Sequence, residues 1–235
     1  MPFLEHLGEL RVRIFRALLA VLLFFAIGWY FSRPIFRFFL APILPFLQGH
    51  KPVFLEITEP FLLYMKVAFL AGLFAASPVI LYQVWAFISP GLYPNERRYA
   101  APFIVLSSLF FIGGGLFGYY VAFPYAARFL LSVAGDFEPA LTVRSLFQFE
   151  SKLILAMGLI FEMPVVIFIL AKVGIVTPAF LLRNFKYAVL VIFVVAAIIT
   201  PTPDVITQCV FALPMVGLYL LGLGASCLVR PGTRS

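Results

Sequence analysis

Residues 67–95 read VAFLAGLFAASPVILYQVWAFISPGLYPN and contain no charged side chain. The hydrocarbon core of a bilayer is about 30 Å thick, and a helix needs roughly 20 apolar residues to cross it. This stretch is therefore long enough to span a membrane, and it is apolar on every side, as a helix in lipid must be. It predicts a transmembrane helix, and the segments on either side of it repeat the pattern.

The composition of the whole chain agrees with a lipid environment. Of its 235 residues, 63% are hydrophobic and 11% are charged, whereas a soluble domain carries roughly a quarter charged residues. The formal net charge of +7 does not indicate nucleic-acid binding, because the basic residues flank apolar spans and form no patch on a soluble module. The first sixteen residues are rich in charge and no cleavage site follows them, so we do not expect a cleavable signal peptide.

The gaps between charged residues divide the chain into six apolar intervals, one of them interrupted only by Glu162. We therefore predict an all-α, polytopic membrane protein with six transmembrane helices in one membrane domain, residues 1–235. Prolines inside three of these helices remove backbone donors and are expected to bend them, which favours a concave bundle over straight parallel rods. The predicted helices are 14–32, 62–88, 100–123, 150–172, 187–202 and 204–228.

Turn-forming residues mark the predicted helix ends. The Ser-Pro-Gly run at 89–91 ends the second helix, Pro124 is expected to close the third, and Gly174 is expected to close the fourth. Each internal proline frees a carbonyl that a neighbouring group must satisfy. These internal prolines are Pro78, Pro164 and Pro214.

The distribution of basic residues predicts the orientation. Those assigned to the inside crowd into short loops, whereas those assigned to the outside are spread over two long segments, about 33–66 and 124–152. Because positive charge in short loops sets topology, we expect both termini to face the cytoplasm. The first outside segment, 34–60, contains an apolar stretch and is expected to form interfacial helices. The last two helices meet in a tight turn at 200–204, and we hypothesise that this short hairpin does not reach the far surface.

Acidic residues near the predicted cytoplasmic face form the first candidate site. On a helix, Glu9 and Arg13 lie four residues apart and can pair, and Glu96 is the only acid in the short loop after the second helix. Two interpretations remain open. Residues 6–13 form an amphipathic segment on the membrane surface, or Glu9 and Glu96 form a patch of paired carboxylates. Such a patch suits a guanidinium ligand, because arginine bonds a carboxylate through a planar fork of donors.

Two further acids lie in or beside predicted spans. Glu162 falls within the fourth helix, where a carboxylate costs roughly 2.5 kcal/mol or more, so it is either a functional group or one that is protonated or bonded to a neighbouring helix. Asp204 follows a proline at a helix start, where a carboxylate caps the first turn, and this favours a structural role. An ion-coupled small-molecule transporter using Glu162 is the alternative function, although we find no internal repeat.

Catalytic and cofactor motifs are absent from the sequence. HExxH, GxSxG and GxxxxGK[ST] do not occur, which argues against zinc protease, serine hydrolase and nucleotide hydrolase activities. Ser107 and Ser108 lie in the third helix, but no histidine or second acid is expected beside them, as an intramembrane hydrolase would need. Cys209 and Cys227 are about 27 Å apart on a helix, too far for a disulfide. We therefore predict a protein that is not an enzyme and has no cofactor or metal.

Five short motifs, in order along nearly the whole chain, resemble the TatC family, the receptor subunits of the twin-arginine protein translocase. The run HLGELRVR at 6–13 is similar to the family's amino-terminal signature, HLxELRxR. The other four are ASPVILYQVWAFI at 76–88 in the second helix, PGLY at 90–93 with ERR at 96–98 in the next loop, FEMPV at 161–165 in the fourth helix, and PDV at 203–205 with Gln208 in the last turn.

This resemblance implies a receptor that binds the twin-arginine signal peptides of folded proteins at its cytoplasmic face. It implies that the receptor gathers the single-helix partners TatA and TatB, together with further copies of itself, for transport driven by the proton-motive force. The implied location is the bacterial inner (plasma) membrane or a thylakoid membrane, in contact with lipid and not with nucleic acid. The implied signal-peptide residues are Glu9, Glu96, Arg11, Phe87 and Leu92.

The resemblance also implies roles for residues within the bundle. The turn at 200–204 is one residue longer than the usual family form, so either of its threonines can match the family position. The implied intramembrane and partner-binding residues are Glu162, Thr202, Asp204 and Gln208, and the implied structural residues are Pro42, Pro78 and Tyr119.

Overall fold

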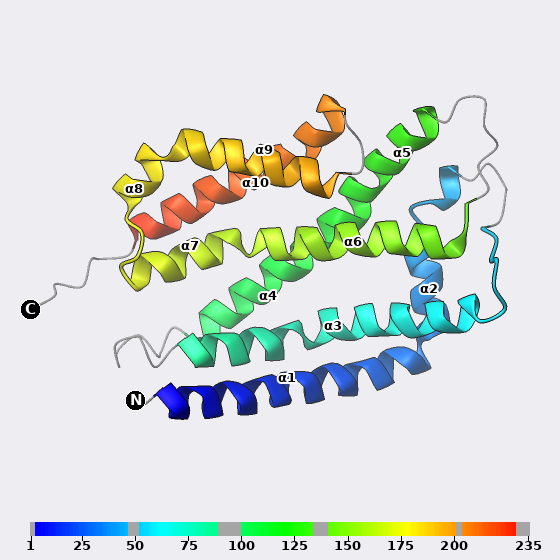
Figure 1. Ribbon diagram of the computed structural model, residues 1–235, viewed down its shortest axis with the longest axis horizontal. Helices are drawn as coiled ribbons and strands as arrows, with labels where there is room; N and C mark the ends of the chain where they lie inside the picture. The colour runs from blue at the N-terminus through cyan, green and yellow to red at the C-terminus, as the bar shows by residue number, and fades with distance from the viewer. Residues whose placement is uncertain (1–2, 47–51, 89–99, 134–140, 201–203, 229–235) are drawn as a thin grey trace, which may run out of the picture. The chain divides into compact units, whose positions relative to one another are not determined.

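The computed structural model describes residues 3–46, 52–88, 100–133, 141–200 and 204–228. Nearly all of these residues are helical (Figure 1). The chain forms two compact units. The first consists of Met1–Ile112 with Ala140–Ser151, and the second of Gly113–Pro139 with Lys152–Ser235.

The first unit is built on a pair of long helices that lie side by side (Figure 1). They are α1 and α3, and α2 follows α1 after a sharp bend. The elements of this unit are α1 (Phe3–Tyr30), α2 (Ser32–Leu40), the 3-10 turn η1 (Leu44–Phe46), α3 (Glu59–Ile88), most of α4 (Ala100–Phe117) and the start of α6 (Val143–Phe161).

Glycines bring α1 and α3 into close, antiparallel contact. A Cβ added to Gly28 would lie 2.9 Å from the carbonyl oxygen of Ala68, and one added to Gly72 would lie 2.8 Å from the backbone nitrogen of Phe25. Small residues at such crossings are typical of membrane helices, which are held together by van der Waals packing because lipid is as apolar as their side chains. Since the later α1 residue meets the earlier α3 residue, the two helices run in opposite directions.

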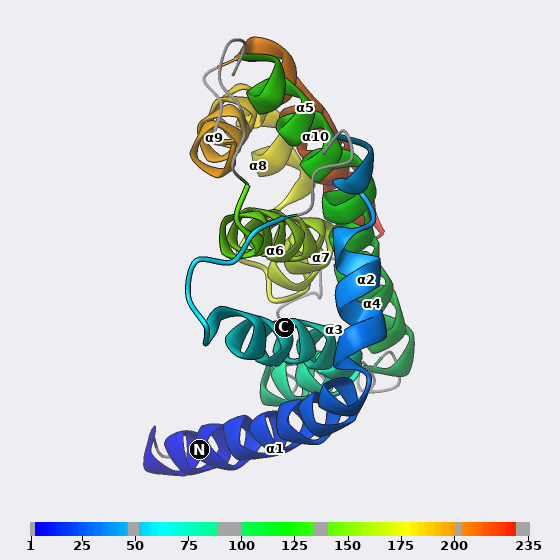
Figure 2. The same cartoon turned by 90° about the vertical axis from the view of Figure 1, so that its right-hand side faces the viewer.

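Helix α1 is longer at its N-terminus than the sequence predicted. The prediction began the first helix at residue 14, but α1 is continuous from Phe3 to Tyr30. The ion pair between Glu9 and Arg13 shows why, because residues four apart face each other only on a helix. The apolar span and its charged lead-in are therefore one helix. At its other end α1 stops at Tyr30, and α2 leaves at 83° to it. Figure 2 shows the sharp turn between the two helices.

The segment after α1 is helical, as predicted, in α2 and η1. In α3, Pro78 lies inside a continuous helix. A proline at this position cannot donate to the carbonyl of Phe74, and the hydroxyl of Ser77 donates to that carbonyl instead, at 2.7 Å. This is the side-chain compensation that the internal prolines were expected to require.

The second unit is centred on α10, which packs against α7, α9 and α8. Gly222 of α10 allows close packing on α7, because a Cβ there would lie 2.7 Å from Cδ1 of Ile167. The elements of this unit are the end of α4, the π-helical turn η4 (Gly118–Ala122), α5 (Phe123–Val133), the end of α6, α7 (Met163–Lys172), α8 (Pro178–Arg183), α9 (Phe185–Ile199) and α10 (Val205–Cys227).

Two further predicted helix boundaries were wrong. Pro124 does not close the third helix, which continues to Val133. The π-helical turn η4 lies directly before this proline and widens the helix, which gives the ring room that a regular turn would not. The fourth helix begins at Val143 and not at 150, because the hydroxyl of Thr142 accepts from the amide of Ser145 at 3.1 Å and caps the helix there.

The fourth helix is also interrupted at Glu162, where α6 ends and α7 begins with Pro164 in its first turn. Its predicted end is confirmed. Gly174 has a φ of +80°, a conformation that glycine adopts without strain, and the amide of Ile175 donates to the carbonyl of Leu170 at 2.9 Å.

Within the described ranges, four helical runs are long and apolar enough to cross a membrane, and the bent α1–α2 pair raises the number to five. Helix α9, with 15 residues, is about 22 Å long and falls short of a 30 Å hydrocarbon core. The chain is thus an all-helical polytopic membrane protein with four or five candidate spans. These spans are Glu59–Phe87, Pro102–Val133, Val143–Lys172 and Val205–Cys227, with Leu7–Tyr30 and Ser32–Leu40 as the bent pair.

Candidate functional site

The N-terminal part of α1 carries a partly buried ion pair. The Nε of Arg13 donates to Oε1 of Glu9 at 3.1 Å, and a terminal guanidinium nitrogen of Arg13 bonds the same oxygen. The Glu9 side chain is 26% exposed, so its carboxylate remains reachable from solvent. Residues four apart on a helix face each other, so the pair follows from the helical spacing.

The α1–α3 pairing brings Glu9 to the level of the last turn of α3. Gly28 faces Ala68 and Gly72 faces Phe25, and continuing this antiparallel register toward the N-terminus of α1 reaches the turn of α3 that holds Phe87. Phe87 is half-buried there.

Arg11 does not face the same way as Glu9. It lies two residues further along α1, about 200° around the helix, and is exposed. The structure therefore brings Glu9 and Phe87 to one level and turns Arg11 toward another face. The other predicted members of this site, Glu96 and Leu92, lie outside the described residues.

Glu162 occupies the N-cap position of α7, at the break in the fourth span. Its backbone amide donates to the carbonyl of Leu159 at 3.2 Å, and its own carbonyl accepts from Val166 at 3.0 Å, so the chain restarts its helix here. A carboxylate at the start of a helix lies close to the positive end of the helix dipole. The position reduces the cost of an acid within a span.

Asp204 and Gln208 both stabilise the hairpin of α9 and α10. Oδ2 of Asp204 accepts from the amide of Thr207 at 2.6 Å, which confirms the predicted helix cap. Nε2 of Gln208 donates to the carbonyl of Phe193 in α9 at 3.0 Å. Thr200 ends α9 with its hydroxyl on the carbonyl of Ala196, at 2.9 Å. Thr202 lies outside the described residues.

The remaining predicted structural residues lie at irregular backbone. Pro42 sits in the turn between α2 and η1. Tyr119 lies in the π-helical turn and is 4% exposed. The adjacent Gly118 allows close packing on α6, because a Cβ there would lie 2.8 Å from the Cα of Ile154.

One acid escaped the sequence reasoning. Glu150 lies in α6 and is completely buried, and neither of its carboxylate oxygens has a hydrogen-bond partner among the described residues. The search for uncharged intervals placed it at the edge of the fourth span, next to Lys152.

Catalytic groupings do not emerge from the described part of the chain. Ser108 uses its hydroxyl to donate to the carbonyl of Ile104 at 2.7 Å. Among the residues that the structure describes, no three His, Cys, Asp or Glu side chains gather into a group that would hold a metal ion.

Comparison with known proteins identifies close relatives over nearly the full length. The family model "TatC: Sec-independent protein translocase protein (TatC)" matches residues 5–214. The chain is 47% identical to the Sec-independent protein translocase protein TatC of Koribacter versatilis (strain Ellin345), over 100% of this chain and 88% of that protein. It is 39% identical to the protein of the same name from Aquifex aeolicus (strain VF5), over 95% of this chain and 93% of the relative.

Two crystal structures are similar as well. One is of the twin arginine translocase receptor TatC, at 38% identity and a TM-score of 0.79, covering 95% of this chain and 99% of the other. The second is of the twin arginine translocase receptor TatC in DDM, at 37% identity and a TM-score of 0.80, covering 96% of this chain and 100% of the other.

Proposed function

The chain belongs to the TatC family of Sec-independent protein translocase proteins, and from this premise we propose that it receives twin-arginine signal peptides on a surface that includes Glu9 and the end of α3. It is a twin-arginine translocase receptor, a membrane protein of Tat transport that is not an enzyme. The family assignment removes the alternative of an ion-coupled small-molecule transporter. The step that remains to be tested is which residues read the signal.

The observation that carries the proposal is the placement of Glu9. Its carboxylate is partly exposed and bonds Arg13 one helical turn away, at the level of Phe87 in the last turn of α3. In the proposed surface Glu9 and Glu96 receive the two signal arginines, and Phe87 and Leu92 provide apolar contacts beside them. Because Arg11 faces elsewhere on α1, we assign it a supporting role only.

The single-helix partners TatA and TatB are proposed to dock on the α9–α10 hairpin. Helix α9 is short, and one side of it is exposed and apolar in Leu190, Val191, Val194 and Ile198. A polar group lies beside this side, because Gln208 bonds the α9 backbone. Polar side chains that hydrogen-bond across helices contribute to helix association in membranes. Thr202, Asp204 and the intramembrane Glu162 complete this proposed partner region.

We propose that the chain crosses the membrane six times, with both termini in the cytoplasm. The short α9 is counted as the fifth span in this topology. The proposed location is the bacterial inner (plasma) membrane, with a thylakoid membrane as the other possibility, and the proton-motive force drives transport. Assembly with further copies of the chain belongs to the same proposal.

Binding of a signal peptide to the full chain in detergent tests the receptor surface. A fluorescent twin-arginine peptide is titrated against its twin-lysine version, which keeps the charge and loses the planar fork. A charge-assisted hydrogen bond contributes about 1.5–3 kcal/mol, so we expect the twin-arginine peptide to bind roughly tenfold or more tightly. Glu9→Gln and Glu96→Gln should each remove most of this preference.

Glu138→Gln is the matched control, because the proposed topology puts this acid on the opposite side of the membrane. It should leave the arginine preference unchanged. Equal affinity for the two peptides, or an equal loss in the Glu138 variant, would contradict the assignment of Glu9 and Glu96 without touching the family assignment.

A further inference from the structure

The first unit encloses a pocket at the ends of two spans, away from the proposed receptor surface. Its volume is about 330 Å³, and it lies between α2, the residues before α3, the first turns of α3 and the first turns of α6. The candidate spans Glu59–Phe87 and Val143–Lys172 both begin here. The pocket therefore lies where helices leave the hydrocarbon core, at the depth of the lipid headgroups.

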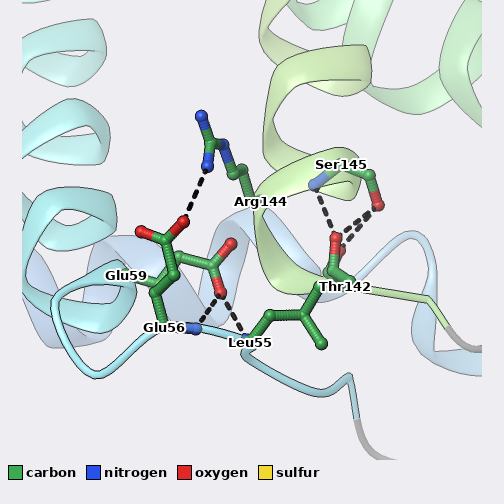
Figure 3. Close-up of polar contacts among 6 residues, drawn as sticks. All are labelled: Leu55, Glu56, Glu59, Thr142, Arg144 and Ser145. Atoms are coloured by element: carbon green, nitrogen blue, oxygen red, sulfur yellow. Dashed lines mark hydrogen bonds and ion pairs between the residues drawn. The ribbon is translucent and has the colours of Figure 1, made fainter.

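The backbone around the pocket is held in place. The amide of Val53 donates to the carbonyl of Leu141 at 3.1 Å, and the amide of Val143 donates back to the carbonyl of Val53 at 3.0 Å. Oε2 of Glu59 accepts from the amides of Leu55 at 2.7 Å and Glu56 at 3.4 Å, as Figure 3 shows. The pocket is thus largely pre-formed, which lowers the cost of binding.

Most of the pocket wall is apolar. It is lined by four aromatic residues on different elements, Phe36 of α2, Phe54 of the segment before α3, Tyr64 of α3 and Phe147 of α6, with leucines from α3. Pockets of about this size with an apolar wall and a few polar groups are typical ligand sites. A space of this size takes part of one acyl chain and is too small for a helix, whose diameter with side chains is about 10–12 Å.

The charged groups of the pocket are available to a ligand. Arg144 lies 3.8 Å from the carboxylate of Glu56, and both side chains are more than half exposed (Figure 3). This is a long pair in a solvated setting, so it contributes little and opens easily. Lys66 also lines the pocket and makes no ion pair with a described residue. Glu59 is occupied by two backbone amides, which leaves two cations and one carboxylate at the rim.

We propose that this pocket binds the headgroup and upper acyl chain of a zwitterionic phospholipid. The phosphate bonds Arg144 and Lys66, the ammonium bonds Glu56, and one acyl chain enters the aromatic wall. Replacing the long Arg144–Glu56 contact with two contacts to a zwitterion leaves neither charge unpaired. The position of the pocket at headgroup depth identifies the occupant as a membrane lipid. A soluble phosphate compound has no apolar part that could contact the apolar wall.

Retention of lipid by the full, delipidated chain in detergent tests this site, with native mass spectrometry counting the bound molecules. The probes are phosphatidylethanolamine, phosphatidylglycerol, which has the phosphate but no ammonium, and glycerophosphoethanolamine, which has the headgroup but no chains. We expect one tightly retained phosphatidylethanolamine. We expect Arg144→Gln and Glu56→Gln each to weaken its binding by about tenfold, as expected when a charge-assisted bond is lost.

Lys152→Gln is the matched control, because Lys152 is an exposed cation of the same helix that does not line the pocket. It should leave retention unchanged. The proposal fails if Lys152→Gln and Arg144→Gln lower lipid retention equally, because the binding would then reflect the general surface charge. It also fails if phosphatidylglycerol binds as tightly as phosphatidylethanolamine. It fails as well if glycerophosphoethanolamine, which has no chains, displaces phosphatidylethanolamine completely. If Arg144→Gln does not fold, Glu56→Gln alone decides, because Glu56 lies outside every helix.

Discussion

Substituting Gly72 by alanine tests whether the α1–α3 crossing holds the first unit together. A Cβ at this position would lie 2.8 Å from the nitrogen of Phe25, 2.9 Å from its Cα and 3.1 Å from the carbonyl carbon of Phe24. All three are backbone atoms, so no side chain can rotate away. The optimal contact distance is about 3.5–4.0 Å, so the two helices have to separate locally by roughly 0.7 Å or more.

The expected magnitude follows from two opposing effects. In an open helix position, exchanging glycine for alanine stabilises by about 0.5–1 kcal/mol. Overpacking of a well-packed contact costs about 1–3 kcal/mol, and a gap of 0.5–1 Å forfeits about a quarter to a half of each neighbouring dispersion contact. We therefore expect Gly72→Ala to lower the free energy of unfolding by about 0.5–2 kcal/mol.

The assay is unfolding in mixed detergent micelles with increasing SDS, followed by far-ultraviolet circular dichroism. Gly217→Ala is the matched control, because Gly217 is in the middle of α10 with no atom within 4 Å of an added Cβ. It should be as stable as the parent chain or more stable. Equal changes in the free energy of unfolding for the two variants would show that α1 and α3 are not packed as closely as described. The helix register that brings Glu9 to the level of Phe87 would then be wrong as well.

Two further substitutions test local hydrogen bonds. Ser77→Ala removes the donor to the carbonyl that Pro78 leaves without a partner, and it should lower the free energy of unfolding in SDS by about 1–3 kcal/mol. The effect of Ser77→Ala should be smaller when Pro78 is also replaced by alanine. Additive effects of the two substitutions would contradict the proposed compensation. Asp204→Ala removes the cap on the amide of Thr207 and should cost about 0.5–2 kcal/mol, whereas Asp204→Asn should retain most of the stability. If the Asn variant is stable but fails to co-purify with single-helix partners, the charge of Asp204 has a role beyond capping.

The sequence predicted the spans well because lipid imposes a simple requirement. Uncharged runs must be helical in a bilayer, since no water is available for backbone groups, and α3, α9 and α10 lie close to their predicted ranges. The boundaries that failed were those fixed by local detail. Pro124 was read as a helix end because its neighbours gave no sign of a π-helical turn. The start of α6 was missed because Arg144 was read as a charge of the second outside segment.

The candidate site was predictable only in part, and for a related reason. The spacing of Glu9 and Arg13 is a local property of a helix, so the pair followed from the sequence. The pocket before α3 did not, because it depends on a bridge between Val53 and Thr142, which are far apart along the chain. Nothing in the local pattern of either residue indicates the other. Long-range pairing of this kind requires the structure.

The buried acid Glu150 provides a last test of how polar groups are tolerated in this chain. One carboxylate oxygen of Asp204 is compensated by its capping bond, whereas neither oxygen of Glu150 has a hydrogen-bond partner among the described residues. A buried polar group in this condition costs about 1–3 kcal/mol, so Glu150→Leu should raise the free energy of unfolding by a similar amount. A destabilised variant would mean that the carboxyl bonds a group that the described residues do not include. A stabilised variant that no longer exports twin-arginine substrates would be more informative, because a residue kept at a cost to stability is kept for its function. In that case Glu150 would join Glu162, the acid that the sequence singled out, as a candidate functional acid of the fourth span.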